Sequence, residues 1–341
     1  MTRAATLLLA VLIRAPAAPA ASGAAAAQEA QAAQDRGVLL EKYQAAQKRH
    51  LAGEIEPARA AMKEVLDADP GNAELALSIA RWLVMERSDF LGGEPFARRA
   101  HELEPRSLEA TNLAGGCLVH AGRPAEAEAI YRAAVERFPA DATMRYGLGM
   151  ACGQQKKYLE AKSWYAAAIE LDPDQGLFHF SAGENLANLR DYAASERELR
   201  LAVKLAGHAD AAWKLGEVLA QQGKDAEAEK VLLAALERGP LASRWNAGLQ
   251  LGILLFERGR PAEAAAFLHK ATQVRPEGRD AWMWLARAQR ALGKEEAAER
   301  SLKRYQELRA KEDRSEEERL LGLIRAQLET GRAPPPERRR D

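Results

Sequence analysis

Small and apolar residues recur along this chain with a period of about 34 residues, from near residue 39 to near residue 312. The segment from Gly122 to Pro139 shows the repeating unit, which consists of a turn, an amphipathic stretch and a proline. Within the stretch, small or apolar residues stand three and four positions apart, which places them on one face of an α-helix. Proline cannot continue a helix interior, so it ends the unit. The pattern predicts pairs of α-helices repeated along the chain.

Four columns of related residues keep the units in phase. The first helices carry a small column, with Arg81 as its exception, at Ala46, Arg81, Gly115, Gly149, Gly183, Gly216, Gly252 and Ala286. A second small column follows twelve residues later, at Ala58, Gly93, Ala127, Ala161, Ser195, Ala228, Ala264 and Ala298. A bulky column, with Ala97 as its exception, stands at Met62, Ala97, Tyr131, Tyr165, Leu199, Leu232, Leu268 and Leu302. The closing prolines are Pro70, Pro105, Pro139, Pro173, Pro240 and Pro276, whereas Gly207 and Ala310 take that place in two units.

These columns have a packing explanation. Small residues let two helices approach closely, and the bulky residue fills the space beside them. One pair of helices is too small to bury its own apolar face, so neighbouring pairs must share a continuous core.

The pattern resembles tetratricopeptide repeats. The resemblance rests on the period, on Trp282-Met-Trp-Leu285, on Leu148-Gly149 and Leu215-Gly216, and on the closing proline. It also rests on an Ala–Tyr–Ala series, such as Ala127, Tyr131 and Ala134, in which alanine stands on both sides of the bulky column. Eight units run roughly over residues 39–72, 74–107, 108–141, 142–175, 176–208, 209–242, 245–278 and 279–312. The resemblance implies an all-α fold, a right-handed α-solenoid of stacked helix-turn-helix repeats over residues 39–312. In the second unit, Arg81 and the segment 88–95 depart from the pattern, so its helices are expected to be less regular.

The segments outside the repeats have distinct compositions. Residues 28–38 form a polar, alanine-rich lead-in that is expected to extend the first helix or to fray. Residues 313–331 predict a C-terminal capping helix, because a solenoid must cover its last open face. Its apolar stripe is Leu320, Leu321, Leu323, Ile324 and Leu328. Residues 332–341 predict a disordered tail.

The first 27 residues predict a secretory signal peptide. Arg3 precedes a short apolar run over residues 4–13, and Ala18-Pro-Ala20 offers small residues for cleavage, with alternative sites up to Ala27. The expected destination is the periplasm or the outside of the cell; an uncleaved leader is the alternative. No apolar run reaches the roughly 20 residues that a membrane span needs.

Charge and motifs narrow the function classes. Without residues 1–27 the chain has 47 basic and 49 acidic residues, because it loses Arg3 and Arg14 and no acid. A chain with almost no net charge lacks the overall positive electrostatic potential that attracts nucleic acid. The sequence contains no nucleophile elbow, phosphate-binding glycine loop or zinc-protease motif, and its six histidines are dispersed. We therefore expect no enzyme activity, cofactor or metal.

Cys117 and Cys152 lie on the first helices of adjacent units. Export makes a disulfide worth considering. Cys117 stands two residues after its small-column residue, whereas Cys152 stands three residues after its own. Their side chains therefore point in directions about 100° apart around their helices. Neighbouring helices are also about 8–10 Å apart. Two buried free thiols are favoured over a disulfide.

The resemblance also implies a concave face, lined by the first helices, that holds partner peptides. Aromatic residues occupy the same expected groove position in three successive units, and these predicted anchors are Tyr146, Phe180 and Trp213. Met150, Trp82 and Phe256 extend the predicted site. Such residue types are enriched in binding hot spots and adaptable surfaces. The alternative is that these rings only pack between neighbouring helices. Some members of the family bind the C-terminal carboxylate of a chaperone through lysines on this face. In this chain the equivalent positions hold Asn112 and the three anchors, so this type of binding is not expected.

These observations predict a non-enzymatic interaction scaffold, exported to the periplasm, that binds an apolar or amphipathic protein segment in its groove. The resemblance suggests a role in envelope assembly or secretion. The alternative is a structural solenoid that self-associates and has no peptide-binding groove. Partner identity and oligomeric state are not determined by the sequence.

Overall fold

The computed structural model describes residues 23–205, 209–239 and 241–330, and these residues form sixteen α-helices, one π-helix and no strand. The predicted signal peptide lies outside this part of the chain up to residue 22, and the predicted disordered tail lies outside it altogether. Residues 23–27 and the polar lead-in 28–38 belong to the first helix. The lead-in thus continues the first helix towards its N-terminus.

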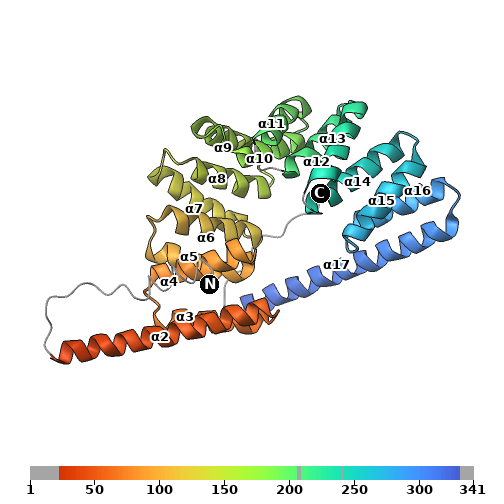
Figure 1. The fold of residues 1–341 in the computed structure, drawn as a ribbon. Helices are drawn as coiled ribbons and strands as arrows, with labels where there is room; N and C mark the ends of the chain where they lie inside the picture. Colours follow the sequence, from red (N-terminus) through yellow and green to blue (C-terminus); the bar gives the residue numbers. More distant parts are fainter. Residues whose placement is uncertain (1–22, 206–208, 240, 331–341) are drawn as a thin grey trace. The chain divides into compact units, whose positions relative to one another are not determined.

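The helices alternate as eight pairs, which confirms the predicted number of units (Figure 1). The first helices of the pairs are α2 (Gly23–Leu51), α4 (Ala73–Arg81) with the π-helix η1 (Trp82–Glu86), α6 (Leu108–His120), α8 (Ala142–Gln154), α10 (Gly176–Asn188), α12 (Ala209–Gln221), α14 (Leu241–Glu257) and α16 (Arg279–Ala291). The second helices are α3 (Ile55–Ala68), α5 (Phe90–Leu103), α7 (Pro124–Arg137), α9 (Tyr158–Leu171), α11 (Tyr192–Lys204), α13 (Asp225–Arg238), α15 (Pro261–Val274) and α17 (Glu295–Thr330).

The chain divides into two compact units within α10, an N-terminal unit that ends at Asn185 and a C-terminal unit that begins at Leu186. In the N-terminal unit, α6 contacts both its partner α7 and the next first helix, α8. In the C-terminal unit, α14 likewise contacts α15 and its neighbouring first helices α12 and α16. Within each unit, the first helices therefore form a layer of their own and share the core, as stacked repeats require.

Each pair is joined through one residue with left-handed backbone, five positions before the second small column. These residues all have positive φ angles and are Gly53, Ser88, Gly122, Lys156, Arg190, Gly223, Gly259 and Gly293. A left-handed residue just beyond a helix end lets the chain reverse, and glycine adopts this conformation without a Cβ penalty. Its recurrence in all eight pairs is the backbone counterpart of the sequence repeat.

Three of the first helices begin at a side-chain cap two residues after the closing proline. Asn72, Ser107 and Asp141 each accept a hydrogen bond from the backbone N–H three residues later. Such caps satisfy one of the donors that a helix start leaves without a partner. The proline ends one unit, and the cap begins the next.

The small and bulky columns meet in the core, as expected. The buried ring of Tyr131 lies so close to Gly115 and Gly147 that a Cβ atom at either glycine would overlap it. The Tyr131 hydroxyl donates to the Asn112 carbonyl at 3.1 Å. Tyr131 therefore inserts between α6 and α8 and sets their approach.

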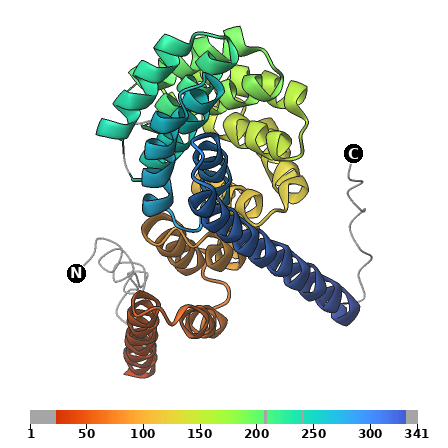
Figure 2. The same cartoon turned by 90° about the vertical axis from the view of Figure 1, so that its right-hand side faces the viewer.

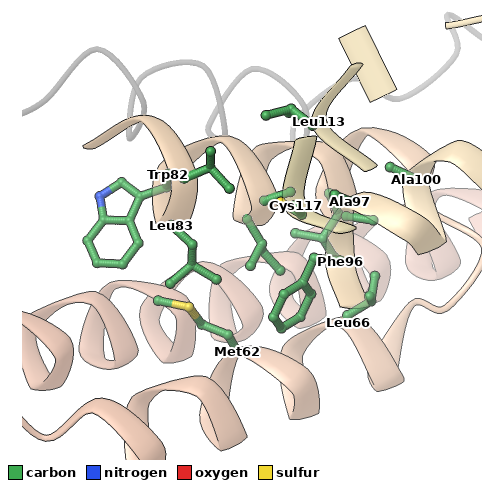
Figure 3. Packing of buried hydrophobic residues seen from close by; sticks show 14 of the residues in the cluster. Met62, Leu66, Trp82, Leu83, Phe96, Ala97, Ala100, Leu113 and Cys117 are labelled. Carbon is green, nitrogen blue, oxygen red and sulfur yellow. The ribbon is translucent and has the colours of Figure 1, made fainter. Parts of the chain in front are cut away.

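The second unit departs from the others through η1. The buried small residue of this first helix is Ala80, whereas Arg81 is half-exposed and pairs with Glu109 at 2.6 Å. The prediction placed Arg81 at the small-column position of this unit, but Ala80, one residue earlier, occupies that position in the structure. Ala80 stands thirteen residues before Gly93 instead of twelve, and a π-helical turn accommodates one such extra residue. Figure 3 shows Leu83 of η1 in the core with Met62 and Phe96.

The C-terminal end differs from the prediction. Figure 2 shows α17 as one uninterrupted helix in dark blue, which runs from Glu295 to Thr330. A separate capping helix over residues 313–331 is therefore incorrect, because the predicted helix continues the second helix of the eighth unit. The physical reason is that Ala310 replaces the closing proline, and alanine favours the helix interior.

Candidate functional site

Two of the six predicted site residues lie in the core of the N-terminal unit. Tyr146 is 7% exposed; its ring stacks on Phe178 with centroids 4.8 Å apart. Its hydroxyl lies 3.1 Å from the Ser181 hydroxyl. Trp82 is 3% exposed and meets the His50 ring edge-on at 5.3 Å. These two rings pack inside the protein, and a partner-binding role for them stays a prediction.

Met150 and Phe180, also in the N-terminal unit, are half-buried. Met150 packs against the core cluster that contains Tyr131, Tyr146 and Tyr165. Part of each side chain remains open to solvent, so both residues keep apolar surface that a partner could cover.

Trp213, on α12 of the C-terminal unit, is also half-buried. The Lys214 ammonium lies 5.4 Å from the centre of its ring and 3.1 Å from the Glu217 carboxylate. The indole Nε1 of Trp213 is buried and has no hydrogen-bond partner among the described residues. Trp213 therefore combines an apolar ring with adjacent charges of both signs.

Phe256 on α14 belongs to an aromatic patch that the sequence interpretation recognised only in part. Its ring meets Trp284 of α16 at a centroid distance of 5.8 Å and an interplanar angle of 66°. The Arg287 guanidinium lies 4.6 Å from the centre of the Trp284 ring. Phe256 and Trp284 are half-buried, and Arg287 is exposed. We call these three residues the aromatic–arginine patch.

Trp284 was missed because it falls outside the groove positions that the resemblance implies. A signal was present in the sequence, since Trp282 and Trp284 stand two residues apart and a helix directs such residues to different faces. The structure separates their roles. Trp282 Nε1 donates to the Pro276 carbonyl at 2.8 Å, whereas Trp284 belongs to the patch.

The patch has the chemistry of a recognition surface. Arg287 has no carboxylate partner among the described residues. A cation over an indole face gains about 0.5–1 kcal/mol at an exposed site, and the guanidinium edge keeps donors for an incoming acceptor. Two half-buried rings beside a free arginine can bind an apolar side chain together with an acidic or carbonyl group.

A polar network joins the third and fourth units. Glu128 accepts hydrogen bonds from Lys157 Nζ at 2.7 Å, from Gln155 Nε2 at 2.6 Å and from Arg132. Arg132 also donates to Glu160 at 2.9 Å. The hydrogen bond from Lys157 is the largest cause that lowers the pKa of Glu128 to about 2, against the opposing effect of burial. The carboxylate is therefore ionised at neutral pH.

The same network recurs between the fifth and sixth units, inside the C-terminal unit. Glu196 accepts from Lys224 at 2.6 Å, from Gln222 at 2.8 Å and from Arg200 at 2.8 Å. Hydrogen bonds, foremost that from Lys224, lower the pKa of Glu196 to about 2. This recurrence indicates a structural role in joining neighbouring repeats.

Among the described residues, one cluster of His, Cys, Asp or Glu side chains is close enough together to hold a metal ion, and it belongs to the first network. Ligand atoms of Glu128, Cys152 and Glu160 lie within 4.8 Å of one another. Lys157 and Arg132 already neutralise the carboxylates. Burial raises the pKa of the Cys152 thiol to about 11, which disfavours the thiolate that a metal needs. Cys117 and Cys152 are buried free thiols, as the sequence favoured.

A second buried network lies beside Trp82. Asp89 caps α5 through the Gly92 N–H, and its carboxylate also accepts from Arg59 Nε and pairs with His50 Nε2, both at 3.0 Å. Burial by itself would raise the pKa of Asp89, but these hydrogen bonds lower it to about 2. Both carboxylate oxygens of Asp89 accept hydrogen bonds from within the protein, which favours a structural role for this residue.

Family comparisons agree with this architecture. Models of the tetratricopeptide repeat match residues 94–142, 118–176, 180–243 and 255–316, together more than half of the chain. Human tetratricopeptide repeat protein 7B is 36% identical over 121 residues, which are 34% of this chain and 14% of that protein. The chain thus matches a small part of that relative's length.

Solved structures show the same fold. Yeast Tom70 aligns with a TM-score of 0.58 at 17% identity, over 80% of this chain and 59% of that chain. A tetratricopeptide repeat protein from Parabacteroides merdae aligns with a TM-score of 0.52 at 15% identity, over 69% and 93%. At these identities the likeness concerns the fold alone. In the described residues, no helix combines the length and apolar character of a membrane span. The repeated columns, the eight helix pairs and the matching family models together show that the chain belongs to the tetratricopeptide repeat family.

Proposed function

We propose that this chain is a protein-interaction scaffold whose aromatic–arginine patch, Phe256, Trp284 and Arg287, binds a segment of a partner protein. The observation that carries the proposal is the stacking of Arg287 on the half-buried Trp284 ring without a carboxylate partner. Arg260 behaves differently, because it pairs with Glu229 of the preceding repeat and with Glu263 of its own repeat. An arginine held instead on an aromatic ring keeps its hydrogen-bond donors available.

The proposed partner segment carries an apolar side chain beside an acidic group. The rings of Phe256 and Trp284 supply apolar area, and aromatic residues commonly dominate the binding energy of an interface. Arg287 supplies charge complementarity, which favours association and orients the segment. This partner is an amphipathic version of the apolar segment that the sequence predicts.

A displayed library of random peptides tests the patch. Peptides selected on the full chain should bind it and lose about 2 kcal/mol or more with Trp284→Ala, as hot-spot residues do. Arg287→Ala should weaken binding of peptides with an acidic residue more than that of neutral ones. Trp282→Ala is the matched control, because it removes the same residue type from the same helix outside the patch. Equal losses for Trp284→Ala and Trp282→Ala would reject the assignment.

The predicted anchors Phe180 and Trp213 belong to the same proposal and are tested separately. Affinity capture would compare the parent chain with a Phe180→Ala/Trp213→Ala variant whose helical content is intact by circular dichroism. A protein captured only by the parent chain supports their role. Identical captures would mean that these rings only pack.

We further propose that the chain is exported and that its signal peptide is cleaved between Ala20 and Ala27. The support is the charged start, the short apolar run and the small residues before residue 28. A cut after Ala27 would remove five residues of α2, a loss that this long alanine-rich helix should tolerate. Mass spectrometry of the N-terminus, after expression in a bacterium and fractionation, tests this. An intact Met1 on cytoplasmic protein would refute it.

A further inference from the structure

In two units, the residue four places before the small column contacts the preceding turn through its side chain. In the fifth unit this residue is His179, whose Nε2 lies 2.9 Å from the Pro173 carbonyl oxygen. In the eighth unit it is Trp282, which donates to the Pro276 carbonyl at 2.8 Å. In the sixth unit the place holds Ala212, and the sequence has Gly207 where the proline would stand. Alanine has no side-chain donor or acceptor, so Ala212 cannot make this contact.

A second large side chain is missing beside Ala212. The residue before the bulky column is Trp164 in the fourth unit and Phe267 in the seventh, but Val231 in the sixth. Because two places hold small residues instead of large ones, a space should remain between the helices.

The structure contains a pocket at this point, inside the C-terminal unit, with a volume of about 520 Å³. Residues of helices α11, α12 and α13 line this open pocket, and Val203, Ala212, Leu215 and Val231 form its apolar walls. Pockets for small ligands measure about 300–1,000 Å³ and are mainly apolar with few polar groups. The size and lining of this pocket suit the apolar part of a small molecule.

The charges at the pocket have one sign. Among the described residues, its charged lining residues are Arg200 and Lys204, and none of its lining residues is acidic. Arg200 is neutralised by Glu196 at 2.8 Å and by Glu227 at 2.6 Å. Lys204 has neither an ion pair nor a side-chain hydrogen bond within the described part of the chain. The pocket therefore combines apolar walls with one uncompensated cation.

We propose that this pocket binds a small amphiphilic carboxylate, with its aliphatic chain between Val203, Ala212 and Val231 and its carboxylate at Lys204. Burial of the aliphatic chain supplies most of the affinity, because apolar surface leaves water. The ion pair with Lys204 selects the charge of the head group. This site is separate from the aromatic–arginine patch, and the proposal stands independently of the proposed function.

Isothermal titration calorimetry of the full chain tests the proposal with three probes of the same chain length. Decanoate carries the expected anionic head, decan-1-ol a neutral head and decyltrimethylammonium a cationic head. All are used as monomers, below the concentration at which they form micelles. Decanoate is expected to bind at least about tenfold more tightly than the alcohol, which corresponds to about 1.4 kcal/mol. The cationic probe should bind most weakly.

Two variants assign the binding to this pocket. Val231→Phe introduces the aromatic side chain that the seventh unit has in this place, and its ring should obstruct the apolar part of the pocket and abolish decanoate binding. Lys204→Glu should weaken decanoate binding at least about tenfold and strengthen binding of the cationic probe. The introduced carboxylate repels the anionic head group and attracts the cationic one. Lys230→Glu is the matched control on α13, since Lys230 is exposed, carries the same charge and does not line the pocket.

Circular dichroism and thermal unfolding confirm that each variant is folded, and Lys204→Glu changes an exposed side chain that the fold does not need. Two results would overturn the proposal. One is no decanoate binding up to about 1 mM, the weak end of specific affinities. The other is decanoate binding that Val231→Phe and Lys204→Glu leave unchanged, which would place it elsewhere on the surface.

Discussion

Tyr146 and Trp213 occupy the same position of the repeat, three residues before the small column, in the N-terminal and C-terminal units respectively. Tyr146 is buried because Phe178 stacks on its ring and Tyr165 lies 5.9 Å away. Trp213 is half-buried, and a lysine lies over its ring. The repeat position sets the helix face on which a side chain lies. The size of the neighbouring side chains then decides whether it becomes core or surface.

The largest expected difference between these residues is in stability. Tyr146→Ala should lower the free energy of unfolding by about 3–5 kcal/mol, as truncation of core aromatics does. Trp213→Ala should cost about 1–2 kcal/mol, because only part of its apolar area leaves water. Urea unfolding of both variants measures the difference. Equal losses would mean that Trp213 belongs to the core, and its proposed role in binding would then be rejected.

Glycines on first helices sharpen the comparison. A Cβ atom at Gly147 in the N-terminal unit would overlap the Tyr131 ring, whereas at Gly248 in the C-terminal unit it would lie 3.5 Å from Leu236. Gly147→Ala should therefore destabilise by about 1–3 kcal/mol through overpacking. Gly248→Ala should be neutral or stabilise by up to about 1 kcal/mol, since alanine is the better helix former. Thermal and urea unfolding would test both, and a tolerated Gly147→Ala would contradict the tight contact.

The two polar networks should behave alike in both units. Glu128→Gln and Glu196→Gln should each cost about 1–2 kcal/mol at pH 7, because each carboxylate holds cations at a largely buried site. Their pKa values are lowered from 4.5 to about 2. This stabilisation is therefore fully present above about pH 4.5 and is lost as the pH falls towards 2.

Urea unfolding of parent and variant at pH 7 and at pH 3 checks this expectation. The difference between them should be smaller at pH 3 in both units. A pH-independent difference would show that the ionised carboxylates are not the source of the stabilisation.

The smallest expected effects are at the left-handed turn residues. Lys156 in the N-terminal unit has a φ angle of 62°, and Gly223 holds the same place in the C-terminal unit with 73°. Lys156→Gly should stabilise by about 1 kcal/mol and Gly223→Lys should destabilise by a similar amount, because the left-handed conformation strains residues with a Cβ atom. Midpoints of urea unfolding measure both. Effects of the same sign would mean that local contacts outweigh the backbone.

The sequence predicted the architecture well because the repeat is a local pattern. Closing prolines, small columns and bulky columns each act within one or two helices, and eight copies in phase leave little ambiguity. The same reasoning failed where one residue broke the period. The π-helix shifted the buried small residue from Arg81 to Ala80, and alanine at position 310 let α17 continue through the expected break.

The candidate site was predicted less completely. The sequence selected aromatic residues at positions that the family resemblance implies, and the structure separates buried Tyr146 and Trp82 from half-buried Phe180, Trp213 and Phe256. Trp284 was not selected because it lies outside the groove positions that the resemblance implies, and its contact with Phe256 joins different units of the repeat. Such contacts depend on the packing of neighbouring helices, which a periodic pattern describes only on average.

The sequence by itself therefore determined the all-α repeat, the number of helix pairs and the family, because helix periodicity and helix-ending residues act over a few positions. Only the tertiary structure decided which rings are buried in the core, that Arg287 lies on an indole ring without a carboxylate partner among the described residues, and where a pocket opens. The physical reason is that exposure and free space depend on the sizes and charges of side chains from several helices at once. Ala212 and Val231 are ordinary helix residues in the sequence, and only their packing against α11 and each other leaves a space.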